Sequence, residues 1–354
     1  MRIALDAMGG DHGPSEVVDG AVLFARENPE HEVILVGQER RIREALRNEL
    51  GALHLSVRHA SEAVEMDDHP SAAIRKKKDS SIRVCFELIR SGEAAAMVSA
   101  GNSGAVMAGA LLVLGRIPGF DRPAFAALFP ALKGEGRCLL LDAGANVDCK
   151  PAHLAQFALI GEVYVRKLLG VERPRVAILS NGEEATKGTA LTRGALELLQ
   201  KSDLRLLGYV EGKDIFSGDV EVVVTDGFTG NIVLKTSEGT AMAVAGLIRT
   251  AIQRAGLSEK LGALLLKPTL AGLRKVVDYA EYGGAPVLGI NGVAIVAHGR
   301  SHARAVKNAL KAAMQTAQAR LNEELAVRIE AAQSWLPTRV AKRVKGTTED
   351  AVSE

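Results

Sequence analysis

Small polar loops follow apolar, strand-like runs at several places in the sequence, and they hold the residues best suited to chemistry. Glycine, asparagine, serine and aspartate dominate these loops, and a helix-like run is expected directly after each one. The loops are Asp6–Asp11, Ser99–Gly104, Asp142–Asn146, Ser180–Gly182, Asp226–Asn231 and His298–Ser301. Backbone N–H groups and helix dipoles that meet beyond strand ends favour a bound anion. The pattern predicts an enzyme that acts on a phosphate or a carboxylate.

A mainly parallel sheet is needed to bring such loops together. Strand-like and helix-like runs alternate in the first third of the chain, which predicts βαβ crossovers with helices on both faces of the sheet. The expected strands include Ile3–Leu5, Val33–Val36 and Leu53–Val57. Helices are expected over Ser15–Glu27, Glu39–Leu50, Pro70–Lys78, Ser80–Ser91, Pro151–Leu169, Gly188–Gln200 and Ser301–Leu325. The predicted fold class is a three-layer, Rossmann-like, doubly wound α/β fold.

The bulk composition is that of a globular protein and excludes some partners. The chain has 354 residues, of which 47% are apolar and 24% charged, with a formal charge of +2. Aromatic residues make up only 4%, which argues against a stacking platform for nucleic acid. The cysteines Cys85, Cys138 and Cys149 lack disulfide or zinc spacing and are expected to be reduced thiols. A strand begins at once after Arg2, so no signal peptide and a cytoplasmic location are expected.

Nothing in the sequence marks a linker, so residues 1–336 are expected to form one α/β domain and residues 337–354 a polar, flexible tail. Residues 243–278 break the alternation. Their apolar positions fall on helical faces with cations between them, which predicts a protruding amphipathic hairpin broken near Gly256 and Pro268. Two alternatives stay open for its role: packing on the core or a dimer interface, or contact with anionic lipid or an acidic partner.

Several common catalytic motifs are missing. No G-x-G-x-x-G follows the first strand, and no phosphate-binding P-loop, G-x-S-x-G elbow or H-E-x-x-H sequence occurs. If the protein carries out acyl chemistry, it is expected to supply no covalent serine. The nucleophile would then be the bound anion itself.

Long sequence blocks resemble the signatures of bacterial phosphate acyltransferases, a family similar to phosphotransacetylases. The blocks are Asp6–Pro14, Ser99–Ala105, Leu141–Asn146, Ser180–Gly188, Asp226–Asn231, Tyr282–Pro286 and His298–Ser301. The family favours threonine where this chain has Ser103, which keeps the hydroxyl group. The resemblance implies a fold like that of isocitrate and isopropylmalate dehydrogenases. It also implies reversible transfer of a long acyl chain from acyl carrier protein to inorganic phosphate, the first step toward phosphatidic acid, with no cofactor or metal.

The resemblance further implies a homodimer at the inner face of the cell membrane, with a membrane glycerol-3-phosphate acyltransferase receiving the product. The expected catalytic residues are Lys187, His298 and Asn231. The expected substrate-binding residues are Gly9, Gly10, Asp11, Asn102, Ser103, Gly104, Asp142, Asn146, Asn181, Asp226 and Gly227. Lys187 as a surface lysine and His298 as a helix cap remain alternatives. Two of the asparagines Asn102, Asn146, Asn181 and Asn231 are expected only to stabilise turns.

Other functions remain open at this stage. They are a short-chain phosphotransacetylase that uses acyl-CoA, a dehydrogenase of the isocitrate type, and a non-catalytic membrane scaffold. The run Arg75–Lys78 is either a solvated helix end or a docking surface for acidic carrier protein. In the docking alternative, charge reversal at Lys76 and Lys77 should weaken use of the carrier-bound donor alone.

Overall fold

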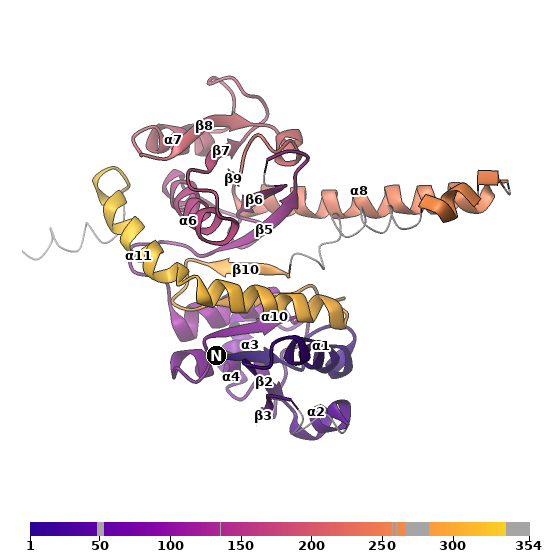
Figure 1. Cartoon of the computed structure of the whole chain (residues 1–354). Helices are drawn as coiled ribbons and strands as arrows, with labels where there is room; N and C mark the ends of the chain where they lie inside the picture. The colour runs from indigo at the N-terminus through magenta and orange to yellow at the C-terminus, as the bar shows by residue number, and fades with distance from the viewer. Residues whose placement is uncertain (48–52, 135, 257, 260, 267–282, 338–354) are drawn as a thin grey trace, which may run out of the picture.

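One continuous sheet runs through the protein, and helices cover both of its faces (Figure 1). The computed structural model describes residues 1–47, 53–134, 136–256, 258–259, 261–266 and 283–337. Within these ranges, eleven strands pair in the order β3-β2-β1-β4-β11-β10-β5-β6-β9-β7-β8. Their bounds are β1 Arg2–Asp6, β2 Glu32–Gly37, β3 Leu55–His59, β4 Ala96–Ser99, β5 Ala124–Pro130, β6 Arg137–Leu141, β7 Arg175–Leu179, β8 Arg205–Val210, β9 Val222–Val224, β10 Ala285–Leu288 and β11 Ala294–Val296.

Two parallel halves flank an antiparallel centre. Strands β3, β2, β1, β4 and β11 are parallel to one another, and so are β6, β9, β7 and β8. Between them, β10 runs antiparallel to β11 and β5, and β5 runs antiparallel to β6. The predicted mainly parallel α/β sheet is confirmed. The antiparallel centre was not predicted. It arises because β5 and β6 are joined by a short connection, and strands joined in this way pair antiparallel.

The helices lie in layers on the two faces of the sheet. They are α1 Gly13–Glu27, α2 Glu39–Leu46, α3 Pro70–Lys76, α4 Ser81–Arg90, α5 Ser103–Gly109, α6 Pro151–Leu169, α7 Ala190–Leu199, α8 Gly227–Arg254, α10 Ala303–Gln318 and α11 Leu321–Ala331, with short segments η1 Ala110–Leu114, η2 Gly212–Phe216 and η4 Ala332–Ser334. Successive residues of β1 alternate between faces. Ile3 and Leu5 join the core under α1 and α10, whereas Ala4 joins the core under α4 and α5.

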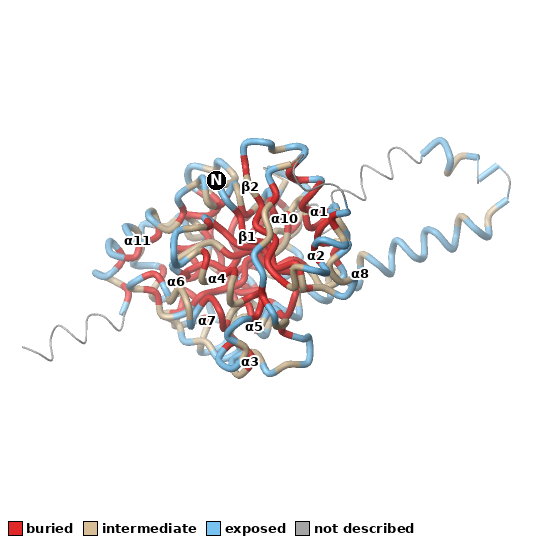
Figure 2. The backbone as a smooth tube through the Cα atoms, turned by 90° about the horizontal axis from the view of Figure 1, so that it is seen from below, coloured by how far each residue is buried: buried red, intermediate tan, exposed pale blue. Residues whose placement is uncertain are grey.

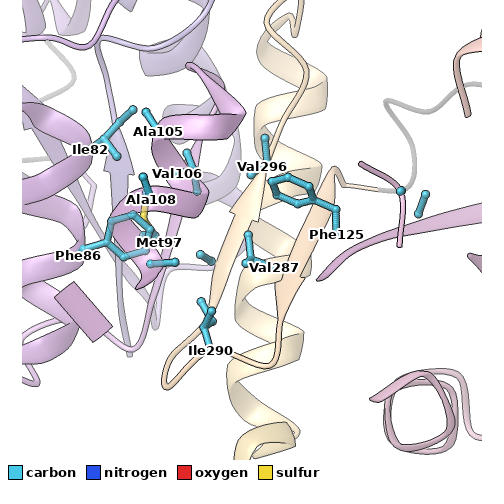
Figure 3. Close-up of a cluster of buried hydrophobic side chains, with 14 of the residues drawn as sticks. Ile82, Phe86, Met97, Ala105, Val106, Ala108, Phe125, Val287, Ile290 and Val296 are labelled. Carbon is cyan, nitrogen blue, oxygen red and sulfur yellow. The ribbon is translucent and has the colours of Figure 1, made fainter. Parts of the chain in front are cut away.

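The core under α4 and α5 extends across the centre of the sheet and so joins its two halves. Figure 3 shows Phe86 and Met97 on one side of this cluster and Phe125, Val287 and Val296 on the antiparallel strands. Figure 2 shows buried residues concentrated in the interior of the body and exposed residues at its surface and along α8. The loops at the strand ends of each half are therefore held in fixed positions relative to those of the other half.

Two predicted helices differ from those observed. The region predicted as one helix over Ser301–Leu325 is two helices, α10 and α11, which meet at Arg320 in a left-handed conformation with φ 49°. The helix after β7 begins at Ala190, with Thr189 as its N-cap, and not at Gly188. The loop that carries Lys187 is consequently longer than predicted. Of the predicted tail, residues 338–354 lie outside the described residues.

Helix α8 is the largest departure from the sequence prediction. Asp226–Asn231 is not a loop that precedes a helix: Asp226 is the N-cap, and the helix continues unbroken from Gly227 to Arg254. Its 28 residues span about 42 Å, and Figures 1 and 2 show it protruding far from the body. The predicted hairpin thus begins on the outer half of α8, and helical residues follow over 261–266. Residues 267–278 of that hairpin lie outside the described residues.

Only two residues of α8 are buried, Gly227 and Gly230. A Cβ atom placed on Gly230 would lie 1.9 Å from the carbonyl oxygen of Asp142, so the helix rests directly on the end of β6. Only glycine permits this approach. No helix within the described ranges has the length and apolar character needed to cross a membrane.

Matched glycine substitutions on α8 test this docking. Gly230→Ala should lower the free energy of unfolding by about 2 kcal/mol or more, because the methyl group overlaps the backbone of Asp142. Gly239→Ala, on the same helix with nothing within 4 Å of the added Cβ, should raise it by up to about 1 kcal/mol through helix propensity. Urea denaturation of both variants measures the two effects. Equal effects of the two substitutions would contradict the docking.

Candidate active site

Loops after three neighbouring strands of one half meet beyond the sheet edge. We call residues 6–12, 99–104 and 297–302, which follow β1, β4 and β11, the first loop group. The backbone N–H of Asp11 donates to the carbonyl of Gly299 at 2.7 Å, and that of Ala297 donates to the carbonyl of Ser99 at 2.8 Å. A Cβ on Gly9 would lie 2.6 Å from the backbone nitrogen of Gly101. The sequence separates these loops widely, but the parallel register brings them into direct contact.

A buried carboxylate organises the first loop group. The Asp6 Oδ2 accepts a 2.6 Å hydrogen bond from the Ser99 hydroxyl, and its Oδ1 accepts one from the backbone N–H of Met8. The Ser99 oxygen in turn accepts from the N–H of Gly101. Burial raises the pKa of Asp6 against the lowering effect of these bonds. Asp6 therefore links the loop after β1 to the loop after β4 through buried hydrogen bonds.

The side chain of Asn102 also forms its hydrogen bonds within the protein. Its Oδ1 caps α5 by accepting from the N–H of Ala105 at 3.0 Å, and its Nδ2 donates to the carbonyl of Met66 at 3.1 Å. The side chain thus fixes the loop after β3 to the start of α5. Next to it, Ser103 is exposed and Gly104 is packed against Pro70. Among the predicted residues of this loop, Ser103 is the one that presents its side chain to solvent.

His298, in the first loop group, is a titratable residue whose burial and hydrogen bonding affect its protonation. It is half-buried, and its Nδ1 accepts a hydrogen bond from the backbone N–H of Arg300 at 3.1 Å. A neutral ring accepting at Nδ1 carries its proton on Nε2. Burial, followed by the charge of Lys235, lowers the pKa of His298. A lowered pKa favours the neutral form of the imidazole at pH 7.

The second loop group comprises residues 142–147 and 225–231, after β6 and β9. Asp142 is its buried centre: Oδ1 accepts from the N–H groups of Phe125, Gly144 and Ala145 at 3.0 to 3.1 Å. Its Oδ2 accepts from the backbone and side-chain nitrogens of Asn146, at 2.7 and 2.8 Å. Burial raises the pKa of Asp142 even so. Both oxygens are engaged within the protein, so Asp142 positions the loop.

The start of α8 is attached to this loop. The N–H of Gly227 donates to the carbonyl of Asn146 at 2.7 Å, while the Asn146 amide donates to the carbonyl of Pro123. Asp226 caps the helix by accepting from the N–H and hydroxyl of Thr229. Asn231 faces Gly144, where an added Cβ would lie 3.5 Å from it, yet its side chain is exposed. Asn231 is thus positioned to reach a ligand in front of the second loop group.

Asn181 and Lys187 lie on the loop after β7, the neighbour of β9, and therefore at the same sheet edge. The Asn181 Oδ1 accepts from the N–H of Gly188 at 3.1 Å and closes its own loop. Lys187 is exposed, and its aliphatic part runs over Gly182. The lysine is three residues before the first residue of α7, so it does not sit at the helix start as predicted.

Helix α8 begins at the second loop group, and the charges of its Lys235 and Glu238 have opposite effects on the pKa of His298: Lys235 lowers it and Glu238 raises it. Lys235 was missed by the sequence analysis, because Asp226–Asn231 was taken for a loop. Had α8 been recognised from Gly227, the i, i+4 spacing of Asn231 and Lys235 would have placed both on the same face of the helix.

Cys149, near the second loop group, is not a nucleophile. Its thiol donates to the carbonyl of Asn146 at 3.5 Å, and burial with the nearby Asp142 raises its pKa to about 12. The thiol therefore stays protonated at neutral pH. Within the described ranges, no group of three or more His, Cys, Asp or Glu side chains has the arrangement of a metal site.

The combined geometry suits chemistry on an anion. His298, Asn231 and Lys187 are half-buried or exposed on these loops, whereas the carboxylates of Asp6, Asp142 and Asp226 are engaged in hydrogen bonds within the protein. Such side chains at the surface of the loops can hold a phosphate and stabilise an oxyanion that develops beside it. The arrangement offers no activated serine or thiolate as a covalent nucleophile.

Comparison with known proteins agrees with this chemistry. Residues 1–324 match the family model described as fatty acid synthesis protein. The chain is 64% identical over 355 residues to a phosphate acyltransferase from Myxococcus xanthus, covering 100% of both chains. It is 52% identical over 331 residues to the phosphate acyltransferase from Geobacter sulfurreducens, covering 93% of this chain and 94% of the relative.

Solved structures with low sequence identity share the fold. A phosphotransacetylase from Streptococcus pyogenes superposes with a TM-score of 0.58 at 19% identity, covering 90% of this chain and 94% of the other. A putative 4-hydroxythreonine-4-phosphate dehydrogenase from Salmonella typhimurium gives a TM-score of 0.51 at 13% identity, covering 89% and 98%. Both confirm the Rossmann-like α/β class predicted from the sequence.

The neutral state of His298 is directly measurable. Its pKa should lie below the usual 6.5, because burial and the Lys235 charge oppose protonation. The ring should therefore stay neutral as the pH falls through 6.5 and become charged only at lower pH. An NMR titration of the histidine ring signals, assigned with His298→Gln, gives the value. A midpoint at or above 6.5 would refute the proposed environment.

Proposed function

The chain belongs to the phosphate acyltransferase family and is an acyltransferase, and we propose that it moves a long-chain acyl group from acyl carrier protein to inorganic phosphate. The product is an acyl phosphate, the reaction is reversible, and it is the first step toward phosphatidic acid. The observation that carries the proposal is the pair of loop groups at the strand ends, one with His298 at its surface and the other joined to the start of α8.

In this reaction the phosphate nucleophile must be positioned more than it must be deprotonated. Phosphate near neutral pH is already largely a dianion, so a phosphate oxygen attacks the thioester carbonyl once it is oriented and desolvated. The new C–O bond produces a tetrahedral oxyanion, and its collapse breaks the C–S bond and releases the carrier thiolate. In our proposal, Asn231 and loop N–H groups stabilise the oxyanion. The proton that the hydrogen phosphate dianion loses as it is acylated goes to the leaving thiolate, and in our proposal the neutral ring of His298 steadies the phosphate.

The other predicted residues take supporting roles in this scheme. Asp142, Asn146, Asn102 and Asn181 are held by hydrogen bonds within the protein and shape the loops. Gly9, Gly10 and Gly227 allow the loops to approach one another closely, as the predicted contacts of an added Cβ indicate. Asp11 borders His298 through the Gly299 hydrogen bond. Lys187, on its exposed loop, remains our proposed cationic ligand for phosphate or the oxyanion.

The surface beside the reacting group favours a long acyl chain over the acetyl group of a short-chain, CoA-dependent phosphotransacetylase. Phe228 and Ile232 lie one turn apart on α8, 59% and 50% exposed, next to Asn231. Apolar side chains at this place can cover methylene groups, each worth about 0.8 kcal/mol when buried. We therefore propose that the acyl chain lies along this part of α8.

A basic surface suits acyl carrier protein as the donor. Helix α3 packs on α5, whose start belongs to the first loop group, and its end exposes Arg75, Lys76 and Lys78. Lys77 does not fit the predicted docking role, because it bonds to Asp68 at 2.5 Å and to the carbonyl of Ala63. We propose that the three exposed cations steer the acidic carrier to the site.

The outer half of α8 supports the proposals for location and assembly. It exposes Leu247 and Ile248, and residues 261–266 add Leu264 and Leu265. We propose that this arm contacts the inner face of the cell membrane, where a glycerol-3-phosphate acyltransferase takes the product. The homodimer is proposed to form through exposed α8 surface nearer the body.

A donor panel tests the function. Thiol release from palmitoyl carrier protein should require phosphate and should yield palmitoyl phosphate, followed by a thiol reagent and by ³¹P NMR. Phe228→Ser should reduce kcat/KM for palmitoyl donors about tenfold or more and for acetyl-CoA little, since only the long chain loses apolar cover. Turnover of acetyl-CoA alone would favour the phosphotransacetylase alternative, and phosphate-independent release would contradict the reaction.

A vesicle assay tests the membrane proposal. Leu264→Glu combined with Leu265→Glu should abolish sedimentation with anionic vesicles and leave turnover of a soluble donor unchanged, because these residues lie far along the arm. Leu132→Glu, at a leucine on the β5–β6 turn that is more exposed than either of these two, serves as the control. Vesicle binding that survives the double substitution would assign the arm another role.

A further inference from the structure

Helix α10 begins against the first half of helix α1, at the first loop group. The N-cap residues of the two helices are His12 for α1 and His302 for α10. The helices also approach each other closely, because a Cβ placed on Gly20 would lie 2.6 Å from the Cβ of Val306. Since α1 follows residues 6–12 and α10 follows residues 297–302, the relative position of these two loops depends on how the two helix starts are joined.

Two histidine rings are stacked at this junction. The ring centroids of His12 and His302 are 4.5 Å apart, and the angle between the ring planes is 16°. Aromatic rings attract each other in stacked pairs at this separation. Both residues are exposed, so the pair removes little apolar surface from water. Its main effect is therefore to hold together the two chain segments that carry it.

Hydrogen bonds join the same two segments beside the stack. The N–H of Ala303 donates to Glu16 Oε2 at 2.7 Å, and Oε1 of this carboxylate lies 3.6 Å from Nδ1 of His302. On the loops themselves, the N–H of Asp11 donates to the carbonyl of Gly299 at 2.7 Å. The stack is one of several contacts between the segments, so its removal should loosen the loops without unfolding the protein.

We propose that His12 and His302 are positioning residues for phosphate binding, and that their stack sets the separation between residues 6–12 and residues 297–302. This inference rests on the proposed function, which places phosphate at the strand-end loops. Loop N–H groups stabilise an anion most when their relative positions are already fixed before it binds. Neither histidine has to touch the substrate in this scheme. The acyl donor is proposed to bind along α8 and at the end of α3, so its affinity should not depend on the stack.

Two other roles for the pair predict different results. A stack that only stabilises the fold would lower the midpoint of urea denaturation and leave the phosphate affinity of the folded protein unchanged. A charged His302 that acts through Glu16 would be lost when phenylalanine replaces the histidine. A stacking role would survive that replacement, because phenylalanine keeps a planar aromatic ring.

Substitutions that separate the ring from its charge test the proposal. His302→Ala should raise the KM for phosphate about fivefold or more, because the loops lose their fixed separation, and should change the KM for the acyl donor less than twofold. His302→Phe should recover most of this loss. His12→Ala should match His302→Ala, and the double substitution should add little, because the same contact is already absent. His54→Ala, at an exposed histidine just before β3, is the matched control and should leave both constants unchanged.

Binding of inorganic phosphate without a donor separates this inference from the proposed function. In calorimetric titrations with phosphate, His302→Ala should bind about fivefold more weakly than the unaltered protein, and His302→Phe should bind nearly as tightly. Equal affinity of the unaltered protein and His302→Ala, or no recovery with His302→Phe, would overturn the inference even if acyl phosphate is formed. Absence of acyl phosphate with every donor would overturn the proposed function, while the calorimetric comparison would still decide the role of the stack.

Discussion

A carboxylate buried at the end of β6 accepts hydrogen bonds from the main chain of Phe125, Gly144, Ala145 and Asn146 and from the Asn146 amide. Removing such a charge from water is expensive, and this set of bonds offsets the cost. The bonds also determine the path of the loop, because each donor must point at one of two oxygens. The carbonyl of Asn146 then receives the first N–H of α8. The direction of the longest helix follows from the placement of Asp142.

Asp6 has the corresponding position in the other half of the sheet. It is also buried at a strand end, and it is bonded to Ser99 and to the backbone of its own loop. Both aspartates come from the loops that first suggested chemistry, yet each is consumed in holding a loop. The groups left to meet a substrate are those at the surface of the loops: His298, Asn231 and the lysines. The buried polar residues hold the loops of the site in place, and in the proposed function the partly exposed residues contact the substrate.

Helix α8 links two properties of the protein in one element. Its first turns complete the candidate site, and its outer turns form an apolar arm that stands away from the body. A helix is stiff over this length because each residue adds a hydrogen bond to the same ladder. The direction of the arm therefore follows from the way the first turns of α8 are held on the second loop group. Gly230 allows α8 to pack directly on the backbone of Asp142.

The sequence by itself determined the local features. Apolar runs such as Ile3–Leu5 and the polar loops after them were sufficient to predict a mainly parallel sheet with an anion-directed edge, because strand and turn preferences act over a few residues. The resemblance of those loops to one family indicated the reaction. Only the tertiary structure decided that β5 makes the centre of the sheet antiparallel and that α8 begins at Gly227. It also decided that the first turn of α8 rests on the loop after β6. These features depend on contacts between residues far apart in the chain, and no local preference encodes which strand ends will be neighbours.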